Sequence, residues 1–252
     1  SAVSSFEAHS ELSVANIIGT NMFNICIVGL VAILAGGIVI KDILLARRDN
    51  IVLFLSTALV AVLFFFGGIT RLFGAAMITL ILAYTVYAIR HDRKNNSISR
   101  DENISWKSEL AKSLLLMLAV VASAKYLVAS ATNIATILGI SEWIIGATIV
   151  AFGTSMPEAT ITVLAALKKE TGLSIGTMVG SITFNLLWVL GFAAMLNPLV
   201  IPFAEISLDL IALVFMTFLF SAGLFKRKIT RIEGLFFVVV YIGYVGYLVG
   251  LV

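Results

Sequence analysis

Long apolar runs separated by short polar connections dominate the pattern of this chain. Crossing a bilayer as a helix takes about 20 largely apolar residues, and eight runs meet that requirement. The runs cover residues 13–40, 43–66, 72–89, 110–138, 143–167, 174–196, 206–225 and 232–252. Because they are continuously apolar and do not alternate, they predict spanning helices and not the strands of a barrel. Residues 1–7 are interpreted as the stub of a ninth span.

The composition is typical of an integral membrane protein. Of the 252 residues, 60% are hydrophobic and only 12% are charged, whereas about a quarter of a soluble domain is charged. The net charge of +3 is concentrated in the connections, so we assign it to membrane topology and not to nucleic-acid binding. Cys26 is the single cysteine, which excludes an internal disulfide and a cysteine-based metal cluster.

Charge alternates between successive connections. Basic residues gather in the connections at 41–48, 90–112, 168–169 and 226–231. The intervening connections hold Glu7, Glu11, Arg71, Glu142 and Glu205. The positive-inside rule places the basic set in the cytoplasm and the C-terminus outside. We therefore expect a multi-pass protein of the cell membrane, with the 90–109 loop cytoplasmic.

The chain contains an internal repeat. Shifting it by 161 residues aligns 12–40 with 173–201, and nine of the 29 positions are identical. The most informative match is Gly-Thr-Asn-Met-Phe-Asn at 19–24 against Gly-Ser-Ile-Thr-Phe-Asn at 180–185, because asparagine is costly in lipid and here recurs in register. The predicted topology runs these two spans in opposite directions. The repeats are therefore inverted, as in several secondary transporters whose substrate sits near the midplane.

The repeat also predicts how the chain is divided. We expect one integral membrane domain with a first repeat at 1–90, a cytoplasmic linker at 91–108 and a second repeat at 109–252. If the first repeat matched the second from its start, roughly 54 residues would precede Ser1, enough for one span and most of another. The intact protein is then expected to hold two five-helix repeats, ten spans, with both termini outside.

The stretch Gly-Thr-Ser-Met-Pro-Glu at 153–158 carries the clearest chemistry. Pro157 lacks an N–H and its ring clashes with the carbonyl of Gly153, so we expect the helix to break over 153–157. Unpaired backbone at membrane depth is tolerated only where it lines a cavity or binds something. Free carbonyls, the hydroxyls of Thr154 and Ser155, and the carboxylate of Glu158 form an all-oxygen set. Such a set suits a hard cation such as Ca2+, and the lack of His or Cys argues against zinc or copper.

A second group of polar residues is expected to face this stretch. Ser181 and Asn185 are four apart and share one helix face, and pseudo-symmetry brings Thr20 and Asn24 in from the other repeat. Bonding between helices is the structural alternative for the asparagines, and close helix packing is the alternative for Thr20 and Ser181. Glu205 and Asp209 lie near the start of a span, where we expect them to serve the helix dipole.

The chain resembles the calcium/cation antiporter superfamily in two motifs that occur in order, Gly-Thr-Ser-x-Pro-Glu and Gly-Ser-x-x-Phe-Asn. The second of them recurs in the first repeat, with Thr in place of Ser. The sodium/calcium exchanger branch is the most similar, and the short 90–109 loop resembles its prokaryotic members. The resemblance implies an all-α, polytopic, inverted-repeat cation exchanger fold, in which two glutamates share a Ca2+. By position, the implied metal ligands are Glu158, Thr154, Ser155, Ala151, Ser181, Asn185, Asn24 and Thr20. Some relatives carry Asp where Asn185 stands, so the ion stoichiometry does not transfer.

The sequence therefore predicts a transporter and not an enzyme. We expect it to exchange Na+ for Ca2+ by alternating access, without a cofactor and as a monomer. An exchanger that couples Ca2+ to H+ is the nearest alternative, because a buried glutamate could carry the proton itself. A cation channel and a membrane interaction protein that transports nothing are alternatives from other classes.

Overall fold

The computed structural model describes residues 10–94 and 141–250, with a few isolated positions between 126 and 139. Within this part, seven helices are long and apolar enough to cross a membrane. They are Glu11–Ala35, Leu45–Phe65, Arg71–Asp92, Glu142–Leu167, Thr171–Leu196, Phe203–Phe225 and Arg231–Gly250. Each corresponds to one predicted span, which confirms an all-α polytopic architecture. The predicted 110–138 span, the stub at 1–7 and most of the linker lie outside the described residues.

Several spans are built from more than one helical segment. The elements are α2 (Ser10–Ala35), β1 (Ile38–Val39), η1 (Leu45–Asp49), α3 (Asn50–Phe65), α4 (Arg71–Lys94), α6 (Glu142–Ile145), η2 (Gly146–Val150), α7 (Ala151–Leu167), α8 (Thr171–Phe184), η3 (Asn185–Val189), α9 (Leu190–Leu196), α10 (Phe203–Phe225), β2 (Lys228–Ile229) and α11 (Arg231–Gly250). The three η segments are π-helical turns inserted into otherwise α-helical spans.

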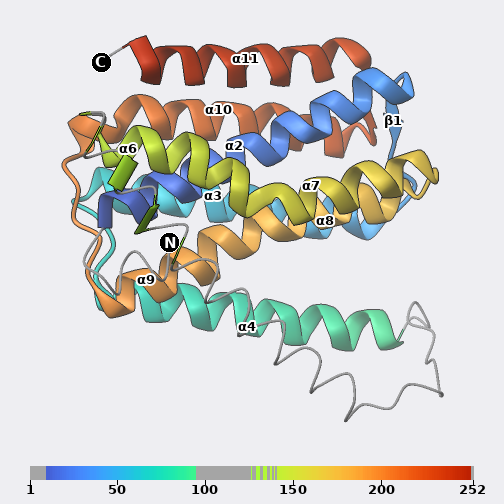
Figure 1. Ribbon diagram of the computed structural model, residues 1–252. Helices are drawn as coiled ribbons and strands as arrows, with labels where there is room; N and C mark the ends of the chain where they lie inside the picture. Colours follow the sequence, from blue (N-terminus) through green and yellow to red (C-terminus); the bar gives the residue numbers. More distant parts are fainter. Residues whose placement is uncertain are drawn as a thin grey trace.

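Helix α2 is the central element of the bundle. It packs against α7, α8, α10 and α11 (Figure 1), and most of its side chains are buried, polar ones included. The surrounding helices present large apolar side chains outward, among them Leu82, Phe218 and Ile242, each at least half exposed. Exposed apolar surface on spanning helices is what the hydrocarbon of a bilayer covers. The polar residues of α2 therefore lie at the centre of the molecule, away from lipid.

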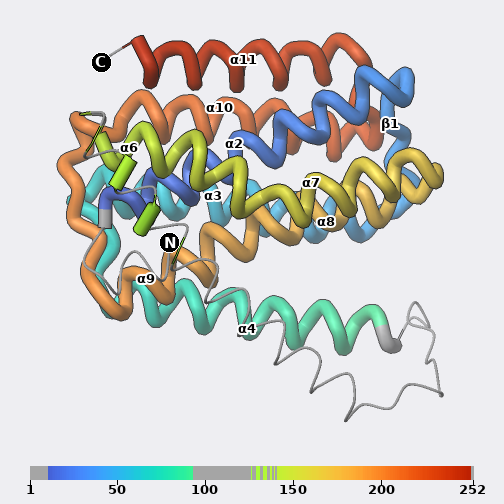
Figure 2. Tube along the Cα trace, viewed as in Figure 1, coloured from blue at the N-terminus to red at the C-terminus, as the bar shows by residue number. Residues whose placement is uncertain are grey.

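Equivalent helices of the two repeats run in opposite directions. In Figures 1 and 2, α2 runs toward β1 while α8 runs away from it, and the pairs α3/α10 and α4/α11 are likewise opposed. At one end of the bundle β1 pairs antiparallel with β2, with Ile38 opposite Ile229. At the other end Ile69 and Leu199 form an isolated antiparallel bridge. Leu199 is the repeat equivalent of Ile38, so the short links that tie the ends together are inverted as well.

Two helix crossings rely on pairs of glycines. A Cβ on Gly234 of α11 would lie 2.6 Å from the carbonyl oxygen of Gly29 on α2, and one on Gly29 would lie 2.5 Å from that of Gly234. Gly74 of α4 and Gly191 of α9 contact each other in the same reciprocal way, at 2.5 and 2.9 Å. Small residues at such crossings let helix backbones approach closely, the usual basis of packing in membranes.

Charge is segregated between the two ends of the bundle. The connections that follow α2, α7 and α10 lie together at the β1–β2 end, and they contain the basic stretches 41–48, 168–169 and 226–231. We call this the basic end. The connections α3–α4 and α9–α10 and the start of α6 lie at the opposite end, which we call the far end. The alternation of charge along the chain thus corresponds to two distinct ends in space.

Candidate cation site

Helix α7 does not break where the sequence predicted a break. It continues from Ala151 through Pro157 to Leu167, so the expectation of an interrupted helix over 153–157 is wrong. The irregularity lies one turn earlier, in the π-helical turn η2. The Thr154 hydroxyl lies 2.9 Å from the Val150 carbonyl and 3.2 Å from that of Ala151. Similar π-helical turns, η1 and η3, occur in spans without a proline, and turns of this kind often mark functional sites.

Helix α2 presents a polar stripe to α7. Asn16, Thr20 and Asn24 follow one another at intervals of four residues and so share a helix face, and all are buried. Gly19 permits the contact, because a Cβ there would lie 2.1 Å from the carbonyl oxygen of Ala147 in η2. The stripe therefore meets the span that carries Glu158 at close range.

The first half of the site joins α2 to α7 through hydroxyl groups. Thr20 Oγ1 and Thr154 Oγ1 are 3.4 Å apart. Both lie within reach of the Asn16 Oδ1 acceptor, at 3.4 Å from Thr20 and 3.3 Å from Thr154. Three oxygens from two helices thus converge on one point.

The second half of the site joins α2, α8 and α7. The Asn24 amide donates to Ser181 Oγ at 3.3 Å, and Ser181 Oγ donates to Glu158 Oε1 at 3.4 Å. One turn further along, the Asn185 amide donates to Asn21 Oδ1 at 3.1 Å. Asn185 is also the first residue of the π-helical turn η3. Glu158 itself is half-buried and forms no ion pair with any residue that the structure describes.

Buried polar atoms without a hydrogen-bond partner gather at this site. Six side chains in the described part of the chain hold such an atom, and three of them belong here: Ser155 Oγ, Asn24 Oδ1 and Asn21 Nδ2. A buried polar atom is almost always paired, and an exception calls for a physical cause such as a bound ion. Two of the three are oxygens, the ligand type that a hard cation prefers.

The structure brings most of the predicted site residues together. Thr20, Thr154, Asn24, Ser181 and Glu158 are linked by the contacts above. Asn185 joins through Asn21, and Ala151 and Ser155 lie on the same stretch of α7, both fully buried.

Sequence reasoning missed Asn16 and Asn21. The repeat comparison pairs them with Thr177 and Ile182, so they did not stand out as recurring positions. The spacing of four between Asn16, Thr20 and Asn24 was the signal that could have identified Asn16. Asn21 carries no such signal, because its role depends on how α8 is placed.

Oxygen and amide groups dominate the chemistry of the site. Glu158 supplies its one carboxylate among the described residues, and no three His, Cys, Asp or Glu side chains in that part of the chain are grouped as a metal cluster. The rest of the set consists of hydroxyls, amide oxygens and backbone carbonyls. Hard cations such as Ca2+ and Na+ prefer these ligands, whereas softer metals prefer nitrogen and sulfur.

Comparison with known proteins identifies a matching family. Residues 1–90 and 109–250 match the family model described as sodium/calcium exchanger protein. The protein CaxA of Alkalimonas amylolytica is 31% identical over 97% of this chain and 80% of its own length. The sodium/calcium exchanger MaX1 of Methanosarcina acetivorans is 37% identical over 45% of this chain and 33% of its own.

A solved structure shares the fold. The sodium-calcium exchanger NCX_Mj, soaked with 2.5 mM Na+ and 0.1 mM Ca2+, superposes with a TM-score of 0.73 at 27% identity. The match covers 97% of this chain and 79% of that one. The arrangement of helices around α2 is therefore shared with a protein that has been studied with these ions.

Proposed function

Because this chain belongs to the sodium/calcium exchanger family, we propose that it exchanges Na+ for Ca2+ across a membrane at the oxygen cluster around α2, α7 and α8. Members of this family are cation antiporters and not enzymes. The observation that carries the proposal is the pair of buried, unpaired oxygens, Ser155 Oγ and Asn24 Oδ1, in the same cluster as Glu158. Removing such oxygens from water is costly unless a ligand compensates, and a cation does so.

The proposed ligands fall into three groups. Glu158 supplies negative charge. Thr20, Thr154, Ser155 and Ser181 supply hydroxyl oxygens, Asn24 and Asn185 supply amide oxygens, and Ala151 supplies a carbonyl. Asn16, which lies within 3.4 Å of two of the hydroxyls, orients them toward the ion.

Exchange follows from one set of oxygens serving both ions. Ca2+ and Na+ compete for Glu158, so one ion leaves as the other binds. A site emptied of both would bury an uncompensated carboxylate, which disfavours closure around it. Alternating access then carries ions across without a leak, because only the loaded site closes.

We also propose the orientation and assembly of the protein. The basic end faces the cytoplasm, as the positive-inside rule requires, and the C-terminus lies outside. We further propose that the protein functions as a monomer.

Equilibrium binding of radioactive Ca2+ to the purified protein in detergent tests the site directly. We expect the wild type to bind Ca2+ and to release it as Na+ is raised. Glu158→Gln keeps the shape and removes the charge, so we expect Ca2+ affinity to fall at least about 100-fold. Glu205→Gln removes an exposed carboxylate of α10 and serves as the matched control. Unchanged binding by Glu158→Gln would overturn the proposed site.

A further inference from the structure

We propose that Asp209 is a positioning residue that holds the site helix in register from the far end of the bundle. This inference rests on the proposed function, because it assigns Asp209 a role in cation binding at Glu158. Asp209 lies in α10, well beyond its first turn, and is only 3% exposed. The predicted role of Asp209 in the helix dipole is therefore wrong, because the residue is buried and lies outside the first turn of α10.

The Asp209 carboxylate joins three helices. Its Oδ1 atom accepts a hydrogen bond from the Trp143 indole N–H at 3.1 Å and from the Tyr244 hydroxyl at 2.6 Å. Trp143 belongs to α6, Asp209 to α10 and Tyr244 to α11. Charge-assisted bonds in a buried setting are stronger and more directional than neutral ones. The three helices are therefore fixed to one another at this point.

Trp143 connects this anchor to the cation site. It lies in the first turn of a continuous helix that runs from Glu142 to Leu167 and carries Glu158. A rigid helix transmits a shift or rotation at one end to side chains further along. The contacts within the site are long, at 3.3–3.4 Å for those of Thr154, Asn24 and Glu158 with their facing side chains. Of the two bonds at Asp209, the one from Trp143, at 3.1 Å, reaches the helix of Glu158, and it is shorter than these site contacts.

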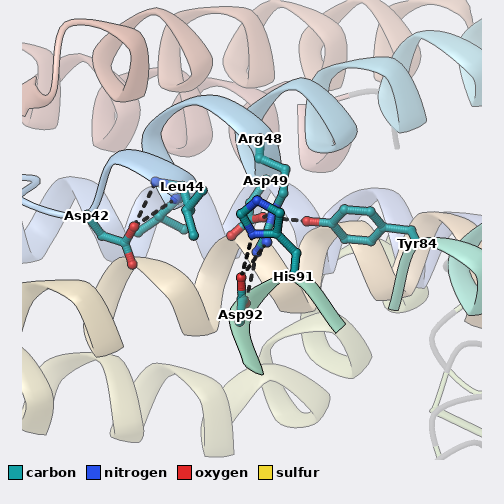
Figure 3. A network of polar contacts seen from close by, with 8 residues as sticks. Asp42, Leu44, Arg48, Asp49, Tyr84, His91 and Asp92 are labelled. Atoms are coloured by element: carbon teal, nitrogen blue, oxygen red, sulfur yellow. Dashed lines mark hydrogen bonds and ion pairs between the residues drawn. The ribbon is translucent and has the colours of Figure 1, made fainter. Parts of the chain in front are cut away.

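The same aspartate–tyrosine bond occurs in the other repeat. Tyr84 of α4 donates to Asp49, the last residue of η1 directly before α3 (Figure 3). In both pairs the two residues are 35 positions apart. Asp49 and Asp209 are 160 positions apart, as are Tyr84 and Tyr244, which is one residue less than the shift of 161 that aligns 12–40 with 173–201. Asp49 also accepts from Arg48 at 2.6 Å, which binds Asp92 at 2.7 Å. Each repeat thus joins two of its spans by an aspartate–tyrosine bond, η1–α3 to α4 in the first and α10 to α11 in the second. Asp209 also bonds Trp143, which lies on the helix of Glu158.

Calcium binding to variants of this anchor in the purified protein, measured alongside thermal unfolding, tests the proposal. Trp143→Phe removes the indole donor and leaves the Asp209–Tyr244 bond in place. We expect it to raise the Kd for Ca2+ about five- to twentyfold, and Asp209→Ala to do at least as much. The double variant Trp143→Phe/Asp209→Ala should be no worse than Asp209→Ala alone, because both changes break the same bond.

Asp209→Asn and Tyr247→Phe complete the experiment. The amide oxygen of Asn can still accept from Trp143, so Asp209→Asn should restore part of the lost affinity. Tyr247 lines the same cavity of about 420 Å³ as Asp209 and Trp143 but makes no hydrogen bond to Asp209, so Tyr247→Phe should leave Kd within twofold. A purely structural anchor would lower the melting temperature and leave Kd unchanged, and that result would overturn the proposal.

Glu158→Gln separates this proposal from the proposed function. If Glu158→Gln abolishes Ca2+ binding while Trp143→Phe and Asp209→Ala bind normally, the site stands and the anchor does not. If Glu158→Gln binds like the wild type, the proposed site is wrong, whatever the anchor variants do.

Discussion

Single polar residues in apolar helices define the function of this chain. Each buried asparagine or hydroxyl costs free energy in a membrane protein unless it finds a partner. Most of those on α2 find one in α7 or α8. Ser155 and Asn24 keep an unpaired oxygen, so the protein tolerates a loss of stability at the position where we propose that an ion binds.

Replacing Ser155 by alanine separates stability from function. The buried hydroxyl has no partner in the described structure, so its removal should leave unfolding unchanged or stabilise the protein by up to about 1 kcal/mol. The same change removes a proposed ligand, so Ca2+ affinity should fall about tenfold. Thermal unfolding and equilibrium Ca2+ binding on the same preparation measure both effects.

Thr217→Val provides the matched control. The Thr217 hydroxyl is also buried and unpaired but belongs to α10, outside the cluster. Its replacement should be neutral or stabilising and should leave Ca2+ affinity unchanged. Normal Ca2+ binding by Ser155→Ala would show that the unpaired hydroxyl has no part in ion binding.

The sequence was most informative where a polar or charged side chain is costly at membrane depth and therefore indicates a specific role. Glu158 was identified as a carboxylate at membrane depth, Asn24 because an asparagine recurs in register, and Ser181 because it shares a helix face with Asn185. The structure brings Glu158, Ser181 and Asn24 together. The predicted role of Asp209 in the helix dipole was wrong. That prediction used only its position near the start of a span, whereas its hydrogen-bond partners Trp143 and Tyr244 lie 66 and 35 residues away in the sequence. Such contacts depend on packing that one sequence does not reveal.

At the scale of elements, seven predicted spans were confirmed because hydrophobic length is a strong signal. The effect of Pro157 was predicted wrongly because the sequence does not show where a helix can relax. Helix α7 continues through Pro157, and the irregular turn of this span is η2, at residues 146–150. Local rules therefore predicted a break at 153–157 that the helix does not show.

The glycine crossings yield a prediction about how the helices pack. Gly234→Ala places a Cβ 2.6 Å from the backbone oxygen of Gly29, so α11 must move away from α2. We expect a loss of about 1–3 kcal/mol, measured as a lower unfolding temperature in detergent. Gly243→Ala lies on the same helix with no atom within 4 Å of its new Cβ and should be tolerated. Equal effects of the two changes would contradict a specific role for the crossing.

At the scale of the whole molecule, the two ends of the bundle differ in charge. The basic end carries 41–48, 168–169 and 226–231, whereas the far end carries Glu11, Glu142 and Glu205 with Arg71 as its one basic residue among those described. A protein with this arrangement should insert in one orientation, because basic loops resist crossing the membrane.

Cysteine labelling in cells tests that orientation. Cys26 is the sole cysteine and is buried, so a Cys26→Ala background provides a protein without thiols. Val200→Cys, at an exposed position of the far end, should react with a membrane-impermeant reagent added outside. Lys168→Cys, at the basic end, should react only after the membrane is opened. The reverse pattern would contradict the proposed topology.

The central claim is that Na+ and Ca2+ exchange through one site that contains Glu158. Its most direct test is radioactive Ca2+ uptake into proteoliposomes that hold the purified protein and internal Na+, with pH clamped on both sides. We predict uptake that requires an outward Na+ gradient, stops when Na+ is equal on both sides and is lost in Glu158→Gln. Uptake driven only by a pH gradient, or flux that needs no counter-ion, would contradict the account.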